Sequence, residues 1–457
     1  MNKFLFRSAS LVFAWMCFNT FNAAAQKTTN PSTTTPAAAD KKVKDYGKDF
    51  FSKDSIHVVK LYFSQCNYWD SLAIYKKLND SLESSQFMQA TVIIDGKKFY
   101  ACGLRFKGES SYDFYPGKKK PFRIKFDKFI KGQNFNGLED LNLTNNFKDP
   151  TMVREKIYLD LMNKHGLPAP RATYAKVYIN DKYWGLYLAN ENIDNVFLET
   201  RFGNSKGNLF QGEPMATFVY LGNDQDKYWP NYILKTNKTR NDWSDLVKFI
   251  KVINDTNLLP DNYLKRLEAT FELNTCLKAW AINNLIGNID AYNVFYPHNY
   301  FIYHDTITTK WNWISLDGNY SFAAWNPIMN FPQLTRMSIM VPDSTPYKGA
   351  RPLLDRTLGK NIEVQKRYLA IVEDLLNTDF KPERMNHVID SLSLRIRVSV
   401  YADVNKMYSN TDYDTNISSN IGDPLDPGNF IPGLKAYLSE RRVNILNEID
   451  ALKKKLD

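Results

Sequence analysis

Two acidic residues stand directly after segments that the sequence predicts to be apolar and regular. Asp290 follows a long apolar helical stretch that ends at Gly287, and Asp317 follows the apolar strand 311–316. Because a rigid strand can hold a carboxylate at the edge of a cleft, such a position is common for a metal ligand. Two such acids suit Mg²⁺, which binds one or two carboxylates together with phosphate oxygens. The pattern is compatible with metal-assisted phosphate chemistry, although helix capping and turn formation are the commoner roles of a sequence such as Asp317-Gly318-Asn319.

Basic residues between positions 118 and 125 are the first candidates for binding a phosphate. Arg123 and Lys125 alternate along one predicted strand and therefore share one of its faces. The run Lys118-Lys119-Lys120 is more typical of a solvated charged surface. The sequence thus favours Arg123 and Lys125 as the pair that faces a cleft.

Several well-known catalytic and metal-binding patterns are missing from the sequence. Its five histidines form no His-Glu-x-x-His pattern and no zinc-type spacing with cysteine. There is no Gly-x-Ser-x-Gly, Walker A or dinucleotide-binding fingerprint either. The motif-bearing hydrolases, zinc enzymes and common nucleotide-binding folds are therefore excluded.

Strands dominate the predicted elements of the first half of the chain. Asp95-Gly96 predicts a tight hairpin turn, since both residues tolerate a positive φ, and a second hairpin is expected around Asp181. The predicted strands are 55–63, 90–100, 102–107, 122–126, 174–180, 183–190, 299–303 and 311–316. A first helix is expected at 151–165, opened by Asp149-Pro150 and stopped by Gly166.

Helices dominate from Phe210 onward. The predicted helices are 243–253, 263–286, 352–358, 363–376, 382–401 and 432–455. A β-rich half followed by a helical half is typical of an α+β protein, here with two lobes and a cleft between them.

The composition is that of an ordinary folded protein. Of 457 residues, 44% are hydrophobic and 24% are charged, which excludes a disordered or fibrous chain. The net charge of +10 is spread along the sequence, so no nucleic-acid partner is expected. Four cysteines are too few for a disulfide scaffold.

The N-terminal residues 1–25 have the pattern of a secretory signal peptide. Lys3 and Arg7 precede the apolar stretch Ser8 to Phe18, and Ala23-Ala24-Ala25 offers a cleavage site before Gln26. Residues 26–44 are rich in Thr, Pro and Ala and are expected to form a flexible linker. No later segment is apolar enough to span a membrane. The protein is therefore expected to be exported to the periplasm, the cell surface or the extracellular space.

After cleavage, the chain would keep three cysteines, Cys66, Cys102 and Cys276. These would form either one disulfide or three unpaired thiols.

From about Ser55 to the C-terminus, the chain resembles the CotH kinase-like family, which is related to the protein kinases. The resemblance is carried by LRFKGESS (104–111), PFRIKF (121–126), the stretch 141–181, YWGLYLANENID (183–194), the stretch 283–305, KWNWISLDGNYSFA (310–323), RPLL (351–354) and PGLKAYLSERR (432–442). It implies a two-lobed, atypical protein-kinase-like domain at 45–457. The β-rich N-lobe would span about 45–190 and the helical C-lobe about 191–457.

The family resemblance also implies roles for individual residues. Lys125 resembles the lysine that holds nucleotide phosphates, Glu155 would form an ion pair with it, and Glu191 would lie at the hinge between lobes. Asp290 resembles the catalytic acid that accepts the proton of the substrate hydroxyl. The metal ligands would be Asp317, Asn319 and Asn299. The implied reaction transfers phosphate from ATP, with Mg²⁺ or Mn²⁺, to Ser or Thr of exported proteins.

Three positions depart from the family pattern. Asn319 replaces a second acid, Ala323 replaces a glycine, and Glu109 stands where Asn is common. Losing one carboxylate should weaken metal binding and the neutralisation of the transferred phosphate. A catalytically weak or inactive pseudokinase that acts as an envelope scaffold is therefore one alternative. Another is a carbohydrate- or peptide-binding surface protein that uses its many aromatic residues, although these can equally form the core.

Overall fold

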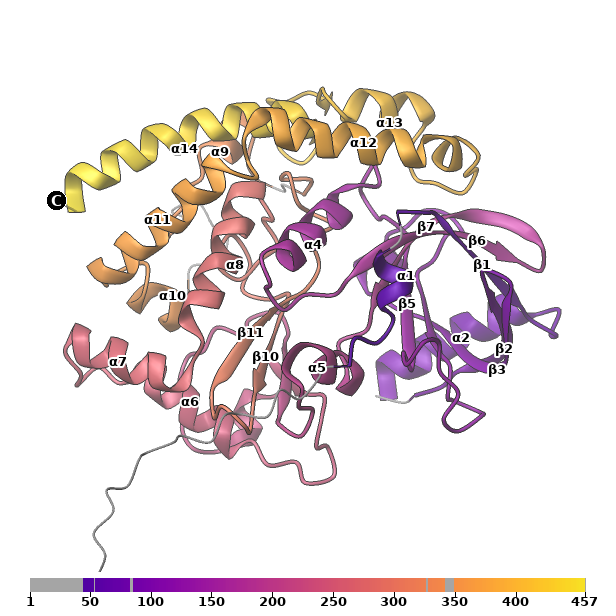
Figure 1. Cartoon of the computed structure of the whole chain (residues 1–457), viewed down its shortest axis with the longest axis horizontal. Coiled ribbons are helices and arrows are strands. Elements are labelled where there is room, and N and C mark those ends of the chain that lie inside the picture. The colour runs from indigo at the N-terminus through magenta and orange to yellow at the C-terminus, as the bar shows by residue number, and fades with distance from the viewer. Residues whose placement is uncertain (1–43, 53, 83–84, 326–327, 342–348, 457) are drawn as a thin grey trace, which may run out of the picture. The chain divides into compact units, whose positions relative to one another are not determined.

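The computed structural model describes residues 44–52, 54–82, 85–325, 328–341 and 349–456 (Figure 1). These residues belong to one compact unit. The expected signal peptide and all of the expected linker except Lys44 lie outside the described residues. Within the described part of the chain, no helix is long and apolar enough to cross a membrane.

Seven strands of the first half close into a barrel in the order β1-β2-β3-β4-β5-β7-β6 (Figure 1). They are β1 (His57–Tyr62), β2 (Met88–Ile94), β3 (Lys97–Phe106), β4 (Phe122–Lys125), β5 (Asp140–Thr144), β6 (Ala172–Ile179) and β7 (Lys182–Glu191). Both expected hairpins are confirmed, and positive φ angles occur at Asp95, Gly96, Asn180 and Asp181. A parallel pairing of β1 with β6 closes the barrel.

Side-chain alternation fills the barrel with apolar residues and turns the basic ones outward. Leu104 and Phe106 of β3 and Phe122 and Ile124 of β4 belong to the buried core inside the barrel. The intervening basic residues of both strands therefore lie on the outer face. Three helices accompany the barrel, namely α1 (Lys48–Ser52), α2 (Tyr68–Leu82) and α3 (Ser110–Asp113).

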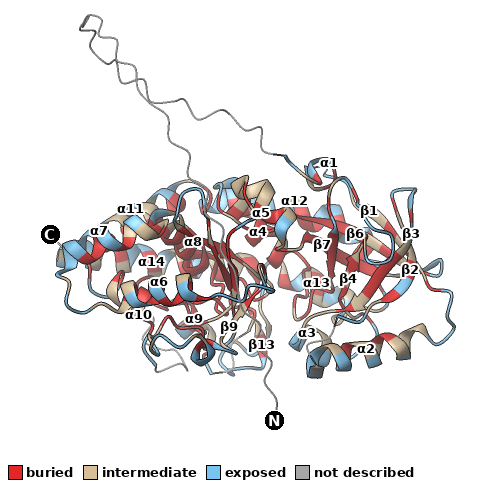
Figure 2. Cartoon of the chain, turned by 90° about the horizontal axis from the view of Figure 1, so that it is seen from below, coloured by how far each residue is buried: buried red, intermediate tan, exposed pale blue. Residues whose placement is uncertain are grey.

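A second and larger core is built by the rest of the chain. The helices of this part are α4 (Arg154–Lys164), α5 (Asn195–Phe202), α6 (Ser244–Asn254), α7 (Pro260–Thr270), α8 (Leu273–Ile286), α9 (Phe331–Thr335), α10 (Pro352–Arg356), α11 (Ile362–Asn377), α12 (Pro382–Tyr401), α13 (Asn410–Asn416) and α14 (Leu434–Leu456). Helix α5 contributes to a third, smaller core instead. Helix α8 is buried along most of its length (Figure 2). Although α4 lies between barrel strands in sequence, its apolar side chains pack into this second core. The α+β class is thus confirmed.

The second half contains more strands than the sequence predicts. A four-stranded sheet has the order β11-β10-β8-β9, and a two-stranded sheet pairs β12 with β13. These strands are β8 (Leu209–Gly212), β9 (Tyr232–Leu234), β10 (Tyr300–His304), β11 (Trp311–Ser315), β12 (Ile421–Gly422) and β13 (Phe430–Ile431). The expectation of helices directly after Phe210 was wrong. The expected helix 263–286 is also divided, because Phe271 is extended and bridges to Trp311.

A buried ion pair joins the barrel to the segment after α12. Lys119 Nζ lies 2.7 Å from Asp403 Oδ2, and both side chains are fully buried. Asp403 also accepts hydrogen bonds from the main-chain N–H groups of Leu186 and Asn405. Lys119 is therefore not part of a solvated face, as its position in the lysine run had suggested.

Candidate active site

Glu155 lies in the first turn of α4 and is almost fully buried, with 9% of its surface exposed. The helix begins at Arg154, because Asp149 accepts hydrogen bonds from the N–H groups of Thr151 and Arg154. Two barrel strands hold the Glu155 carboxylate. Thr144 Oγ1 donates to Oε2 over 3.1 Å, and Asn190 Nδ2 donates to Oε1 over 3.2 Å. The side chain therefore has a fixed position facing the outside of the barrel.

Lys107, directly after β3, is the basic residue that interacts with Glu155. Burial lowers the pKa of Lys107, while the charges of Glu155 and Asp317 act to raise it. Conversely, burial and the charge of Asp317 raise the pKa of Glu155 to about 8, against the opposing effect of Lys107. Lys107, Glu155 and Asp317 thus form one electrostatic cluster. Lys107 belongs to the LRFKGESS stretch, but the sequence had not singled it out as a site residue.

Lys125 does not pair with Glu155 in the structure, so this expected ion pair was wrong. Its Nζ atom lies 2.8 Å from Asp127 Oδ1 and 3.4 Å from Asp140 Oδ2. Arg123 Nε lies 2.7 Å from Asp140 Oδ1, so Arg123 and Lys125 share one face as predicted. Asp140 draws both cations toward β5.

Asp317 stands two residues beyond β11, in a left-handed backbone conformation with φ of 53°. Its Oδ1 atom accepts a hydrogen bond from the Asn319 N–H group over 3.0 Å, which closes a tight turn. Gly318 is required by packing, since a Cβ atom there would lie 2.2 Å from Tyr158 Cδ1 on α4. Burial and the negative charge of Asp290 raise the pKa of Asp317. The turn thus places Asp317 beside α4 and within electrostatic range of Asp290.

Asp290 lies in the loop that follows α8 and interacts with its own downstream segment. Asn299 Nδ2 donates to Asp290 Oδ2 over 2.8 Å, and His298 Nε2 lies 3.3 Å from the same atom. Although burial opposes the charged ring, the hydrogen bond to Asp290 and the charges of Asp290, Asp317 and Glu213 raise the pKa of His298. Asp290, Asn299 and Asp317 therefore lie in one region of the structure. The charges of both acids, Asp290 and Asp317, act on the ring of His298.

These oxygen donors fit a hard divalent cation that also binds phosphate. Asp290 and Asp317 supply two carboxylates, and the half-buried Asn319 and Asn299 can add amide oxygens. Among the described residues, no group of three or more His, Cys, Asp or Glu side chains could form a complete metal cage. Mg²⁺ and Mn²⁺ sites with one or two carboxylates need no such cage, because substrate phosphates complete the coordination.

Glu191 has a structural role that the sequence had not revealed. Its Oε1 atom lies 2.6 Å from Arg171 Nη2, and its Oε2 atom lies 2.6 Å from Arg201 Nη2. With 3% of its surface exposed, the carboxylate is fully engaged by these arginines. A side-chain contact with a nucleotide would have to displace one of them, so we remove Glu191 from the candidate site.

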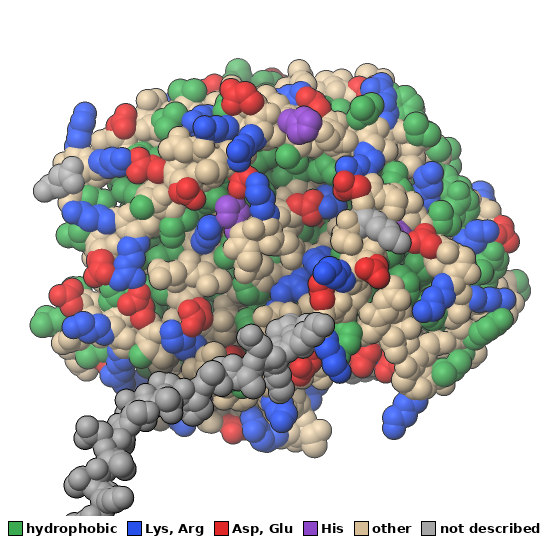
Figure 3. All heavy atoms as spheres, in the orientation of Figure 1, with side chains coloured by type: hydrophobic (Ala, Val, Ile, Leu, Met, Phe, Trp, Pro, Cys, Tyr) green, Lys and Arg blue, Asp and Glu red, His purple; other side chains and the backbone are tan. Residues whose placement is uncertain are grey.

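A group of cations lies near Lys107 on the outer face of the barrel. Arg105 and Arg123 are direct cross-strand partners on β3 and β4. Burial, the charges of nearby Lys238, and those of Arg123 and Arg105 lower the pKa of Lys235 to about 8, although Glu213 opposes this. Lys235 follows β9, so residues from both halves of the chain contribute positive charge to this region. On the face seen in Figure 3, basic and acidic side chains are interspersed.

A family model described as CotH kinase protein matches residues 104–422, which include Lys107, Glu155, Asp290 and Asp317. The chain belongs to the CotH kinase protein family. A similar protein is inner spore coat protein H of Bacillus subtilis, with 26% identity over 314 residues, covering 66% of this chain and 78% of the relative. Invasin CotH3 of Rhizopus delemar is 24% identical over 182 residues, covering 38% of this chain and 30% of the invasin. Invasin CotH2 of the same organism is 24% identical over 202 residues, covering 41% of this chain and 34% of the invasin.

For this CotH family member, replacing Glu155 with glutamine is expected to raise stability at alkaline pH. The ordinary pKa of the carboxyl is 4.5 and burial raises it to about 8, so the folded state favours the neutral acid. The neutral acid's contribution to the free energy of unfolding is complete below about pH 4.5 and is lost as the pH rises toward 8. The variant should therefore unfold at a higher temperature than wild type, by a gap that widens as the pH rises from 5 to 9. Thermal unfolding between pH 5 and 9 measures this, with the exposed Glu139→Gln as a matched control. A gap that shrinks with rising pH would contradict the assigned environment of Glu155.

Proposed function

We propose that the protein is an exported, kinase-like enzyme that transfers phosphate from ATP to Ser or Thr of exported or surface proteins. The observation that carries this proposal is the electrostatic cluster of Lys107, Glu155, Asp317 and Asp290. These residues come from four separate segments of the chain. Glu155 and Asp290 are buried, Asp317 is half-buried, and the charge of Asp317 acts on Glu155 while that of Asp290 acts on Asp317. Such an arrangement is costly for stability, and it is expected where a cation and a phosphate are bound.

Each residue has a definite role in this proposal. Lys107, oriented by Glu155, holds the phosphates of ATP, and Arg105, Arg123 and Lys235 attract the polyanion. Asp317, with Asn319 and Asn299, would hold Mg²⁺ or Mn²⁺, which would neutralise phosphate charge when bound. Asp290 accepts the proton of the acceptor hydroxyl while the hydroxyl oxygen bonds to the γ-phosphorus and ADP leaves. The protein contributes mainly positioning and charge stabilisation.

The two-lobed kinase-like arrangement is part of the same proposal. The closed barrel would form the N-lobe at about 45–190, and the remaining sheet and helices would form the C-lobe at about 191–457. An exported location is proposed from the pattern of residues 1–25 and from the names of the relatives, which are a spore coat protein and two invasins.

A pseudokinase that binds nucleotide and serves as a surface scaffold is the second candidate. Asn319 favours it, because the metal site then has one fewer charged ligand than the family pattern. The decisive assay incubates the chain from residue 45 onward with ATP, Mg²⁺ or Mn²⁺ and candidate exported proteins, followed by mass spectrometry. Phosphorylated Ser or Thr supports the enzyme. Nucleotide binding with neither autophosphorylation nor substrate phosphorylation would support the scaffold instead.

Two lysine variants distinguish the structure-based assignment from the sequence-based one. Lys107→Ala should weaken the affinity for Mg·ATP about tenfold or more, because it removes the cation beside Glu155 and Asp317. Lys125→Ala should change that affinity less than about twofold, because Lys125 is already paired with Asp127 and Asp140. Calorimetric titration with a non-hydrolysable ATP analogue measures both. The assignment of Lys107 fails if only the Lys125 variant loses affinity.

A further inference from the structure

Strands β1 and β2 separate at one end and leave a hollow on the outside of the barrel. The two strands are paired from Val59↔Ile94 to Tyr62↔Thr91, but β2 begins earlier, at Met88. Beyond Tyr62 the chain turns away, and the Phe63 N–H group donates to Asn180 Oδ1. Within the described residues, Met88–Ala90 therefore pairs only with β3. The hollow has a volume of about 450 Å³, which is within the range of small-molecule binding sites.

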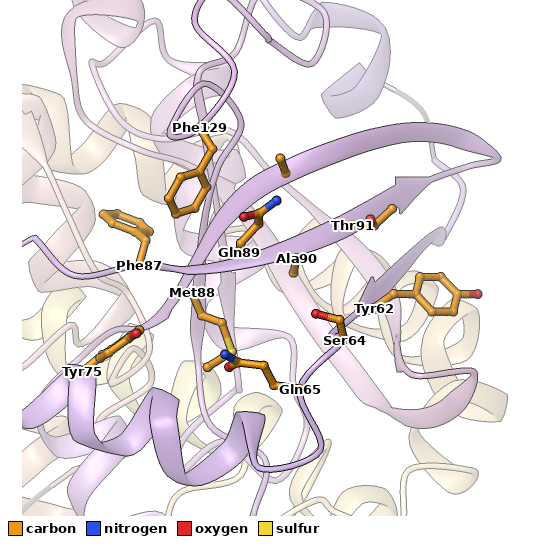
Figure 4. A pocket seen from close by; sticks show the side chains of 11 residues that line it. Tyr62, Ser64, Gln65, Tyr75, Phe87, Met88, Gln89, Ala90, Thr91 and Phe129 are labelled. Atoms are coloured by element: carbon orange, nitrogen blue, oxygen red, sulfur yellow. The ribbon is translucent and has the colours of Figure 1, made fainter.

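The lining of this hollow combines aromatic rings with neutral polar side chains. Figure 4 shows the rings of Tyr75, Phe87 and Phe129 grouped at one end near Gln89, while the ring of Tyr62 points away at the other. Phe129 is 47% exposed, so its ring is accessible to a ligand.

The polar side chains of the lining are free to bind a ligand. Ser64, Gln65 and Gln89 are exposed, and Thr91 is half-buried. None of these four side chains has a hydrogen-bond partner within the described part of the chain. Two amides and two hydroxyls supply both donors and acceptors.

The hollow carries no charge of its own. Its lining contains no Lys, Arg, His, Asp or Glu. The charged groups at its border already have partners, because Asp181 binds Lys60 and the Tyr62 hydroxyl, while Arg105 and Lys128 lie over the Phe87 ring. A ligand that matches this surface is therefore uncharged.

We propose that this hollow binds a neutral carbohydrate chain. The exposed ring of Phe129 can pack against the C–H face of a sugar ring, and the unpaired amides and hydroxyls can bind the many hydroxyl groups of a neutral sugar. The open edge of β2 adds main-chain donors and acceptors. None of the lining residues belongs to the candidate active site, so this site would tether the protein to a polysaccharide independently of phosphoryl transfer.

The test is direct binding of the full chain to three soluble hexasaccharides, which are β-1,4-linked glucose, β-1,4-linked N-acetylglucosamine and α-1,4-linked glucose. Saturation-transfer NMR and calorimetry should detect at least one of them. Phe129→Ala and Gln89→Leu should each weaken that binding about tenfold. Phe114→Ala is the matched control, because Phe114 is 71% exposed and does not line the hollow.

Three results would overturn the proposal. The first is that none of the three hexasaccharides binds. The second is binding that neither the Phe129 nor the Gln89 variant reduces, while both variants melt at the wild-type temperature. The third is that an uncharged extended peptide, paired with the open edge of β2, binds in the hollow and excludes the sugar. Carbohydrate binding requires no ATP. A negative result in this test would therefore not count against the proposed kinase activity, and a negative kinase assay would not count against carbohydrate binding.

Discussion

Replacing Asp317 with asparagine is expected to abolish phosphoryl transfer and to weaken metal-dependent nucleotide binding, with the fold intact. The charge of Asp317 acts on Lys107, Glu155 and His298. Asp317 also interacts electrostatically with Asp290. Since Asn319 is neutral, Asp317 supplies the only charge of the Asp317-Gly318-Asn319 turn. We expect a loss of at least about a hundredfold in kcat, comparable with the removal of one group that stabilises transition-state charge.

The isosteric change is chosen because it separates chemistry from folding. An asparagine at 317 can still accept the hydrogen bond from the Asn319 N–H group, and asparagine tolerates the positive φ at this position. The melting temperature should therefore stay close to that of wild type. Asn319→Asp is the matched variant, and it should keep or raise activity by restoring a second acid. If Asp317→Asn binds Mg·ATP like wild type and still transfers phosphate, Asp317 serves only the turn.

Replacing Asp403 with alanine is expected to destabilise the protein by about 3–5 kcal/mol, the largest stability effect that we predict. The Asp403 carboxylate is fully buried and binds Lys119 Nζ over 2.7 Å, so its removal leaves an unpaired charge in the core. It also leaves the N–H groups of Leu186 and Asn405 without their acceptor. Gly185 packs directly against this carboxylate, since a Cβ atom at position 185 would lie 2.6 Å from Asp403 Oδ2.

Denaturant unfolding measures this effect, with an exposed ion pair as the control. Asp390 pairs with Lys435 and its side chain is 56% exposed, so Asp390→Ala should cost less than about 1 kcal/mol. The double variant Lys119→Met, Asp403→Leu should recover part of the lost stability, because it removes the buried charge together with its partner. Equal costs for the Asp403 and Asp390 variants would contradict the burial of the Lys119–Asp403 pair.

Local patterns in the sequence predicted much of the fold correctly. Asp95-Gly96 and Asn180-Asp181 specify their turns through backbone conformation, and α12 has the expected bounds Pro382–Tyr401. These features depend on neighbours in the chain, which a sequence displays directly. Strands β8 and β9 were missed because they are only four and three residues long and depend on pairing with β10 and each other.

The candidate site was predicted in part, for a related reason. Asp290 and Asp317 were proposed from their positions at the ends of elements, and Glu155 from the family resemblance. The same resemblance pointed to Lys125, and nothing in the sequence singled out Lys107. The packing of α4 against β5 and β7 brings Glu155 close to Lys107. Lys125 forms an ion pair with Asp140 instead. The arginine partners of Glu191 were not predicted, because Arg171 and Arg201 lie in other segments of the chain.

The position of the metal ion tests the central claim most directly. Crystals grown with Mn²⁺ and a non-hydrolysable ATP analogue allow the metal to be located by its anomalous scattering. We expect an Mn²⁺ ion about 2.0–2.2 Å from an Asp317 carboxylate oxygen, with the phosphates of the analogue between Asp317 and Lys107. An ion and nucleotide bound elsewhere, with Asp317 free of metal, would contradict the proposed active site.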